Sequence, residues 1–253
     1  MRSRFMVVGL VAFLGAGCGT PSVPGSGASG SGVASSRVAS SGCAHPYYPL
    51  REGYAVSYKS SVKGLPESIF TVKAADTSGD KATLQYTFTR PGGPADAGIS
   101  MSLDIECVGG DLKAKGQLDM ASAMSGKRVT STTKKSSGEL LPKNLAVGSE
   151  WDGEFQVETV LDNPTAVRLG MGNVSSTMTL HHKAVREEEV TVPAGTYTAL
   201  VVESDMQILT SLPGATGYKP PTIRTTEYWV KGVGLVKSVT ESSMIEATSI
   251  TLP

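Results

Sequence analysis

Apolar and polar residues alternate along much of the chain after residue 50, which is the pattern of β-strands with one buried face. Two runs show it most clearly, one on each side of Arg90-Pro91-Gly92-Gly93-Pro94. Their apolar positions are Ala82, Leu84, Tyr86 and Phe88 in the first run, and Ile99, Met101, Leu103, Ile105 and Cys107 in the second. Lysine, threonine, serine and acidic residues fill the positions between them. Both runs predict strands that place one face against a core and the other in water.

A longer run follows the turn-forming sequence Pro193-Ala194-Gly195. Proline presets φ for a turn, and glycine reaches positive φ without a Cβ clash. After the turn, one face carries Leu200, Val202, Met206 and Ile208, and the other carries Glu203, Asp205 and Gln207. The segment Val185 to Val192 predicts the strand that enters the turn, and Val174, Met178, Leu180 and His182 form one face of an earlier strand. Further on, Lys231-Gly232-Val233 predicts a hairpin.

Together these patterns predict a mainly β protein with about ten to twelve strands joined by short turns. Such an order excludes parallel βαβ units and favours one antiparallel meander, folded as an open half-barrel or a β-sandwich. The sequence Leu118 to Ser125 predicts the one short helix. The polar segment Lys127 to Lys135 predicts an edge strand, because lysines discourage edge-to-edge pairing.

The N-terminus predicts export. Arg2 and Arg4 precede an apolar run from Phe5 to Leu14, and small residues lead to Cys18. Residues 1–17 are therefore interpreted as a signal peptide, and the run is too short for a stable bilayer span. The small residues before Cys18 resemble a bacterial lipobox, which implies lipidation of Cys18; the alternative is ordinary cleavage nearby. Residues 18–42 then form a glycine- and serine-rich flexible tether, and residues 43–253 form the β domain.

Charge and motif content narrow the possible functions. The chain has 23 basic and 23 acidic residues, so no basic excess favours nucleic acid. His181 and His182 are adjacent and should point to opposite faces of a strand, which disfavours a shared metal. Asp104 and Glu106 share a polar strand face and are interpreted as solvated surface. We therefore expect no metal, no cofactor and no enzymatic activity.

The remaining chemistry belongs to cysteine. In an oxidising compartment thiols pair, and with Cys18 acylated only Cys43 and Cys107 remain. The sequence predicts a disulfide between them, with two free buried thiols as the alternative.

Several short motifs resemble an uncharacterised family of exported bacterial β-rich proteins, often lipoproteins. They are the turn Pro193-Ala194-Gly195-Thr196-Tyr197 and the hairpin sequence from Tyr228-Trp229 to Gly232-Val233-Gly234-Leu235-Val236-Lys237. Weaker matches lie at Tyr48-Pro49-Leu50 and at Val147 to Trp151. The resemblance implies an export-related β domain and implies no chemistry. Its architecture is similar by analogy to the incomplete barrels of LolA- and LppX-type lipid carriers.

Two functional classes follow from this interpretation. The first is an envelope lipoprotein that binds a hydrophobic ligand such as a lipid inside the barrel. The expected lining is Leu84, Tyr86, Phe88, Met101, Leu103, Leu200, Val202 and Ile208. The second is a structural or protein-interaction module of the envelope without a ligand cavity. In either case the lipid anchor at Cys18 predicts a membrane-attached protein, at the outer membrane or cell surface rather than the inner membrane.

Overall fold

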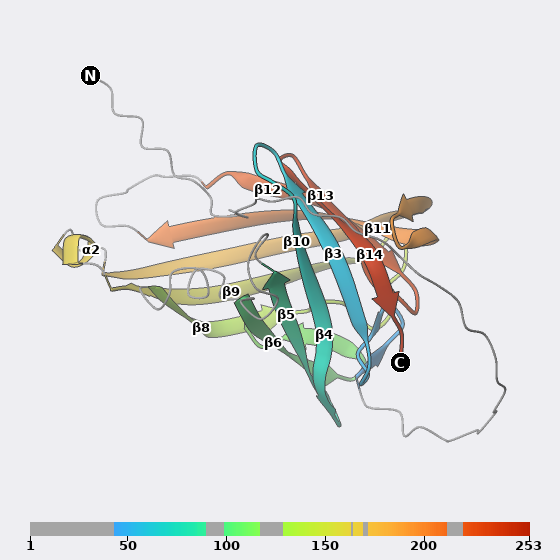
Figure 1. Ribbon diagram of the computed structural model, residues 1–253. Helices are drawn as coiled ribbons and strands as arrows, with labels where there is room; N and C mark the ends of the chain where they lie inside the picture. The colour runs from blue at the N-terminus through green and yellow to red at the C-terminus, as the bar shows by residue number, and fades with distance from the viewer. Residues whose placement is uncertain (1–42, 90–98, 117–128, 163, 169–171, 212–219) are drawn as a thin grey trace.

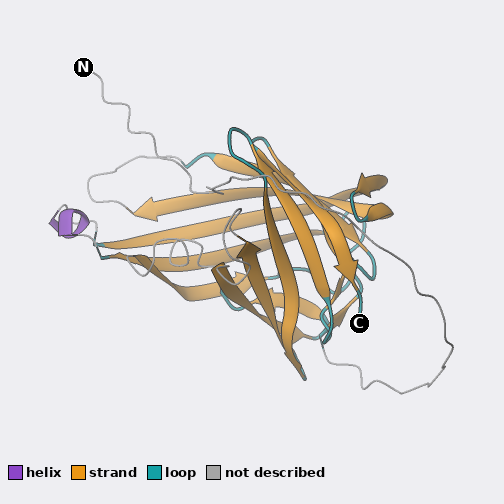
Figure 2. Ribbon diagram, in the orientation of Figure 1, coloured by secondary structure: helices purple, strands orange, loops and turns teal. Residues whose placement is uncertain are grey.

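The computed structural model describes residues 43–89, 99–116, 129–162, 164–168, 172–211 and 220–253. Within these residues nearly all of the chain is strand, as Figure 2 shows. The predicted signal peptide (1–17), the tether (18–42) with Cys18, and the predicted helix Leu118 to Ser125 lie outside the described residues.

A small hairpin comes first and a large sheet follows. The hairpin consists of β1 (Ala44–His45) and β2 (Tyr48–Pro49). The first half of the large sheet contains β3 (Ala55–Val62), β4 (Ser68–Ser78), β5 (Lys81–Thr89), β6 (Ile99–Val108) and β7 (Asp111–Ala114). The second half contains β8 (Val129–Gly138), β9 (Glu150–Leu161), β10 (Asn173–Val192), β11 (Gly195–Ser211), β12 (Thr222–Val230), β13 (Gly234–Thr240) and β14 (Ser243–Thr251).

The large sheet has 12 antiparallel strands in the order β7-β6-β5-β4-β3-β14-β13-β12-β11-β10-β9-β8. Each strand pairs with its neighbour in sequence except β7 and β8, and the last strand, β14, returns to pair with β3. The sheet curls on itself into a nearly closed barrel with one seam, between β7 and β8 (Figure 1). The predicted antiparallel meander is confirmed in its barrel form, and the single sheet rules out the sandwich.

Hydrogen bonds connect the two sides of the seam at one end. The amide of Leu112 on β7 donates to the carbonyl of Leu141 at 2.9 Å, and the amide of Leu140 donates to the carbonyl of Leu112 at 2.7 Å. The hydroxyl of Ser136 on β8 also donates to the carbonyl of Ala114 at 2.5 Å. The loop after β8 therefore substitutes for a paired strand where β7 ends. The polar strand predicted from Lys127 to Lys135 is β8, and it lies at the edge of the sheet as expected.

Turn chemistry sets the register of the hairpins. Gly109 and Gly110 have φ values of 65° and 104°, which are the positive angles that a tight two-residue hairpin needs. The Pro193-Ala194-Gly195 turn joins β10 to β11, and its position fixes 17 paired residues on each side of the hairpin up to Ser175 and Ser211. The two separate strands predicted around His182 and Val190 are wrong, because β10 is one strand of 20 residues with a bulge between Ala184 and Arg186.

A short helix, α2 (Pro164–Arg168), connects β9 to β10 at the far end of the long strands (Figure 1). Proline suits the first turn of a helix, because its missing N–H would have no helical partner there.

Candidate functional site

The inward face of the barrel follows from the strand register. Side chains directly opposite one another across neighbouring strands share a face. One inward row can be followed across five strands, from Met101 through Tyr86, Val72 and Val56 to Ile250. A second row runs from Trp151 through His182 and Ser204 to Thr225. The inward face of the described strands is the candidate site, and we call it the inner face.

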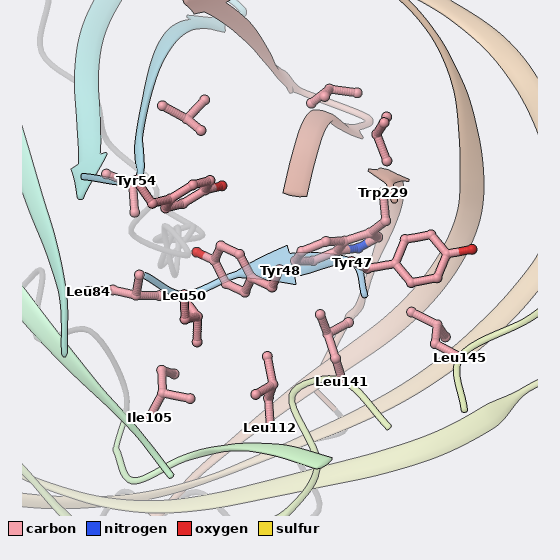
Figure 3. Close-up of a cluster of buried hydrophobic side chains, with 14 of the residues drawn as sticks. Tyr47, Tyr48, Leu50, Tyr54, Leu84, Ile105, Leu112, Leu141, Leu145 and Trp229 are labelled. Atoms are coloured by element: carbon pink, nitrogen blue, oxygen red, sulfur yellow. The ribbon is translucent and has the colours of Figure 1, made fainter. Parts of the chain in front are cut away.

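The N-terminal hairpin fills one end of the barrel. Figure 3 shows Tyr48 in the centre of the ring of strands, with Leu84 and Ile105 on one side and Trp229 on the other. The Tyr48 ring meets the rings of Tyr54 and Trp229 edge-on, with centroids 5.7 Å apart in each case. Leu50 is completely buried. The barrel is therefore plugged at this end, which we call the closed end, by side chains that precede the large sheet.

Hydrogen bonds hold the hairpin in place. The amide of Tyr47 donates to Nδ1 of His45 at 3.1 Å, so Nε2 carries the proton that is donated to the carbonyl of Pro142 at 2.9 Å. Burial lowers the pKa of His45, although the Pro142 carbonyl opposes this effect. The amide of Gly232 donates to the carbonyl of Pro46 at 2.7 Å. A neutral His45 thus joins the plug to the loop after β8, and Pro46 joins it to the β12–β13 turn.

At the closed end, two tyrosine hydroxyls donate hydrogen bonds to backbone carbonyls near the start of β13. The hydroxyl of Tyr54 donates to the carbonyl of Val233 at 3.0 Å, and that of Tyr58 donates to the carbonyl of Leu235 at 2.7 Å. Burial raises the pKa of both phenols. Gly234, with φ of 114°, leaves room for the Tyr54 hydroxyl, which would lie 2.4 Å from any added Cβ. The glycine of the Gly-Val-Gly motif is thus required by close approach as well as by its backbone angle.

The predicted lining residues divide between two environments. All eight belong to the inner face by register. Leu84, Leu200 and Val202 are part of the buried core at the closed end, and Met101 is also buried. Tyr86, Phe88 and Leu103 are only partly buried and pack against that core. Ile208 is partly exposed and lies outside the core cluster.

The other end of the inner face is open to solvent, and we call it the open end. Beyond the core, most of its inward apolar side chains are only partly buried although they point into the barrel, whereas Met178, opposite Ile208, is buried. The partly buried ones are Phe88, Ile99, Phe155, Val157, Leu180, Met206, Ile208 and Ile223. A packed barrel core would bury these positions as completely as it buries Leu84 and Leu200. The interior is therefore filled at the closed end and accessible at the open end.

Polar groups interrupt the apolar inner face between the two ends. The ring of His182 stacks on that of Trp151 with centroids 5.0 Å apart, and His182 Nδ1 lies 2.6 Å from the Ser204 hydroxyl. Burial lowers the pKa of His182 to about 4, so the ring is neutral near pH 7. Glu227 accepts a hydrogen bond from Trp229 Nε1 at 3.0 Å, and burial raises the pKa of its carboxyl. Sequence reasoning missed Glu227, because its charge suggests a solvated position.

The outer face is polar by comparison. His181 Nδ1 lies 2.8 Å from an Asp152 carboxylate oxygen on the outside of the sheet, so His181 and His182 do point to opposite faces. A shallow groove of about 550 Å³ surrounds this pair, lined also by Glu154, Asp205 and Gln207. In the part of the chain that the structure describes, no three His, Cys, Asp or Glu side chains are grouped to hold a metal ion.

Cys43 and Cys107 lie at disulfide distance, with their Cα atoms 5.1 Å apart. Cys43 is completely buried at the start of the plug, and Cys107 ends the inward positions of β6. A bond between them would attach the plug to the barrel wall.

The family model described as DUF3108-like matches residues 58–244, well over half of the 253-residue chain. The chain belongs to the DUF3108-like family. The match covers β3 through the start of β14 and leaves the plug outside. The predicted membership of an uncharacterised β-rich family is confirmed, and the family description assigns no activity.

Two solved structures share the fold of this DUF3108-like chain. One is a protein from Parabacteroides distasonis ATCC 8503 that is classed as a lipoprotein. Its sequence is 18% identical to this chain, and the two structures superpose with a TM-score of 0.54 over 81% of this chain and 98% of that one. The other is a protein from Bacteroides fragilis NCTC 9343 that is classed as exported and has a YmcC-like fold. Its sequence is 15% identical, and the two structures superpose with a TM-score of 0.50 over 79% of this chain and 96% of that one. At these identities the likeness concerns the fold alone.

No curated protein matches the sequence. Among the described residues, no helix has the length and apolar character to cross a membrane.

Proposed function

We propose that this DUF3108-like protein is an exported, lipid-anchored envelope protein that binds a hydrophobic ligand through the open end of its barrel. The observation that carries the proposal is the partial exposure of inward apolar side chains such as Phe88, Phe155 and Ile208. Side chains that point into a barrel and still meet solvent leave room for another apolar group. Each CH₂ group buried there would contribute about 0.8 kcal/mol of binding free energy.

The closed end supports the same interpretation. With Tyr48, Leu50 and Trp229 buried at one end, a chain entering from the open end meets a packed floor. The proposed site is therefore closed at this end. A long acyl chain would enter it as far as the level of Met101 and Val202, which are already buried in the protein alone.

Export and anchoring are supported by the N-terminal sequence and by the two proteins of similar structure. Arg2, Arg4 and the apolar run Phe5 to Leu14 lead to Cys18, the proposed lipidated residue. A similar fold occurs in a protein classed as a lipoprotein and in one classed as exported. We place the protein at the outer membrane or cell surface, because Gly19 after the lipid cysteine lacks an acidic inner-membrane retention residue.

Native mass spectrometry tests ligand binding. The exported chain with Cys18→Ser, which removes the anchor, should be purified from its own envelope without detergent and should carry a lipid mass. Leu103→Arg puts a charge on the partly buried inner face and should remove that mass, while Ile69→Arg, at a position 54% exposed on β4, should retain it. Circular dichroism checks that both variants fold.

A ligand-free chain that also fails to bind a fluorescent fatty acid or monoacylglycerol would favour the interaction module instead. Anchoring is tested separately by labelled palmitate. The wild-type chain should incorporate it and Cys18→Ser should not, and equal incorporation would contradict lipidation at Cys18.

A further inference from the structure

The described strands carry their cationic side chains on one face of the sheet only. Every lysine and arginine in the described strands belongs to the outward set by register or by its ion pair. Examples are Lys183 with Glu150, Lys237 with Glu246 and Arg186 with Glu188. The inner face of the described strands therefore offers no cationic side chain to a ligand.

Two titratable side chains of the inner face, His182 and Glu227, are engaged in hydrogen bonds. His182 is stacked on Trp151 and bonded to Ser204, and its buried ring is neutral near pH 7. Glu227 is bonded to Trp229, and burial favours the protonated form of its carboxyl. A ligand that carries a negative charge would thus meet no counter-ion on the described strands, and the carboxyl groups of Glu227 and of Glu187, which lies opposite Leu200, belong to the same face.

The inner face does offer neutral hydrogen-bonding groups without partners. The hydroxyls of Ser60 and Ser68, which lie opposite each other on β3 and β4, are buried and make no hydrogen bond. Trp151 Nε1 is also buried without an acceptor. These side chains are 0%, 6% and 7% exposed, so they are unsatisfied groups inside the protein. Buried donors and hydroxyls of this kind are normally paired, and an unpaired one loses its hydration without compensation.

We infer that the ligand presents an uncharged hydroxyl or ester group to the inner face, as a monoacylglycerol does, rather than a carboxylate, sulfate or phosphate. The inference rests on the proposed binding function and specifies its ligand class. Its basis is the combination of unpaired neutral groups at Ser60, Ser68 and Trp151 with the confinement of all strand cations to the outer face. Hydroxyls and esters can satisfy such groups, whereas a buried anion needs a counter-charge or several donors.

Two probes with monounsaturated chains of equal length, an oleoyl ester and an oleyl sulfate, test the inference. Monoolein is neutral and oleyl sulfate is a permanent anion, and each is titrated at about pH 7 below its aggregation concentration into the exported Cys18→Ser chain. Both tryptophans of the protein, Trp151 and Trp229, belong to the inner face, so their fluorescence reports occupation of the barrel. Monoolein should bind at least about tenfold more tightly than oleyl sulfate, a difference of about 1.4 kcal/mol.

The two probes distinguish a failure of the inferred ligand class from a failure of the proposed binding function. Equal or tighter binding of oleyl sulfate would overturn the inference and leave lipid binding intact. Failure of both probes to bind would overturn the proposed function together with the inference.

Adjacent residues on β11 provide a matched pair of variants. Ile208 is inward and partly buried, and Leu209 is outward and 53% exposed. Ile208→Lys supplies the missing cation and should shift the preference toward oleyl sulfate by about tenfold, whereas Leu209→Lys should leave the preference unchanged. The same shift in both variants would mean that surface charge governs binding, and this too would overturn the inference. If Ile208→Lys does not fold, the comparison of the two probes on the parent chain still decides.

Discussion

The closed and open ends of the barrel use the same kind of strand for different purposes. At the closed end the inward side chains meet a plug, and Leu50, Tyr54 and Leu84 are buried almost completely. At the open end inward residues on the same strands, such as Phe88 and Ile208, remain partly exposed. Alternation alone thus fixes which side chains point inward, while the presence of a filling segment decides whether an inward side chain becomes core or lining. The predictions below test this difference, beginning with the largest expected effect.

The disulfide should matter most, because it fastens the plug. Linking Cys43 to Cys107 closes a loop with a sequence separation of 64, which constrains the unfolded chain by about 4 kcal/mol in the entropy model. Reductant should therefore lower the urea midpoint of the exported chain, and peptide mapping without reductant should find the two cysteines joined. Cys43→Ser should show the lower midpoint already and should not respond to reductant. Two alkylatable thiols in freshly exported protein would contradict the bond.

Truncation of the plug should cost more than truncation of the open end. Leu50→Ala removes a fully buried side chain and should lower the free energy of unfolding by about 3 kcal/mol. Ile208→Ala removes a partly exposed side chain and should cost about 1 kcal/mol, since less of its transfer free energy is lost. Urea unfolding measures both. Equal losses would show that the open end is packed as core.

His182, between the two ends, should make stability depend on pH. Its pKa is about 4 in the folded protein and about 6.5 when unfolded, so the unfolded state binds more protons between these values. Stability should fall as pH drops from about 6.5 toward 4, by about 3 kcal/mol in total. His182→Gln should reduce this slope, and His181→Gln on the outer face should keep it.

Glu227 acts in the opposite direction in the same pH range. Its folded pKa is raised, so its protonation favours the folded state as pH falls and partly masks the His182 effect. The His182 comparison is therefore sharpest in a Glu227→Gln background. A slope that survives His182→Gln there would assign the pH dependence to other groups.

The loss of a single hydrogen bond should give the smallest difference in stability between the closed end and the open end. Tyr54→Phe removes the buried bond to the Val233 carbonyl and should cost about 1 kcal/mol. Thr210→Val removes a hydroxyl bonded to Ser176 near the open end, where water can replace it, and should change stability by less than about 0.5 kcal/mol. Thermal unfolding with matched scan rates resolves the two. Similar losses would argue that the open end excludes water.

The sequence by itself determined the strands and their inward faces. The alternation of Leu84 and Tyr86 with threonine and glutamine, and of Met206 and Ile208 with Asp205 and Gln207, is local information, because a period of two orients each side chain before any strand finds its partner. The same local logic placed His181 and His182 on opposite faces and gave the Gly109-Gly110 hairpin. It also identified the family through the two turn motifs around Gly195 and Gly234.

Only the tertiary structure decided what those faces enclose. Closure depends on β14 returning to β3 across nearly 200 residues and on Leu141 bridging the seam, and neither pairing leaves a local pattern. The plug was missed because Tyr48 lies in a two-residue strand and Leu50 directly after it, and such a segment is too short to show a period. Glu227 was missed because a glutamate whose pKa is raised by burial cannot be told from a solvated glutamate in the sequence. Side-chain direction is set by neighbours in sequence, but burial is set by neighbours in space, and this physical difference separates what the chain predicts from what the fold decides.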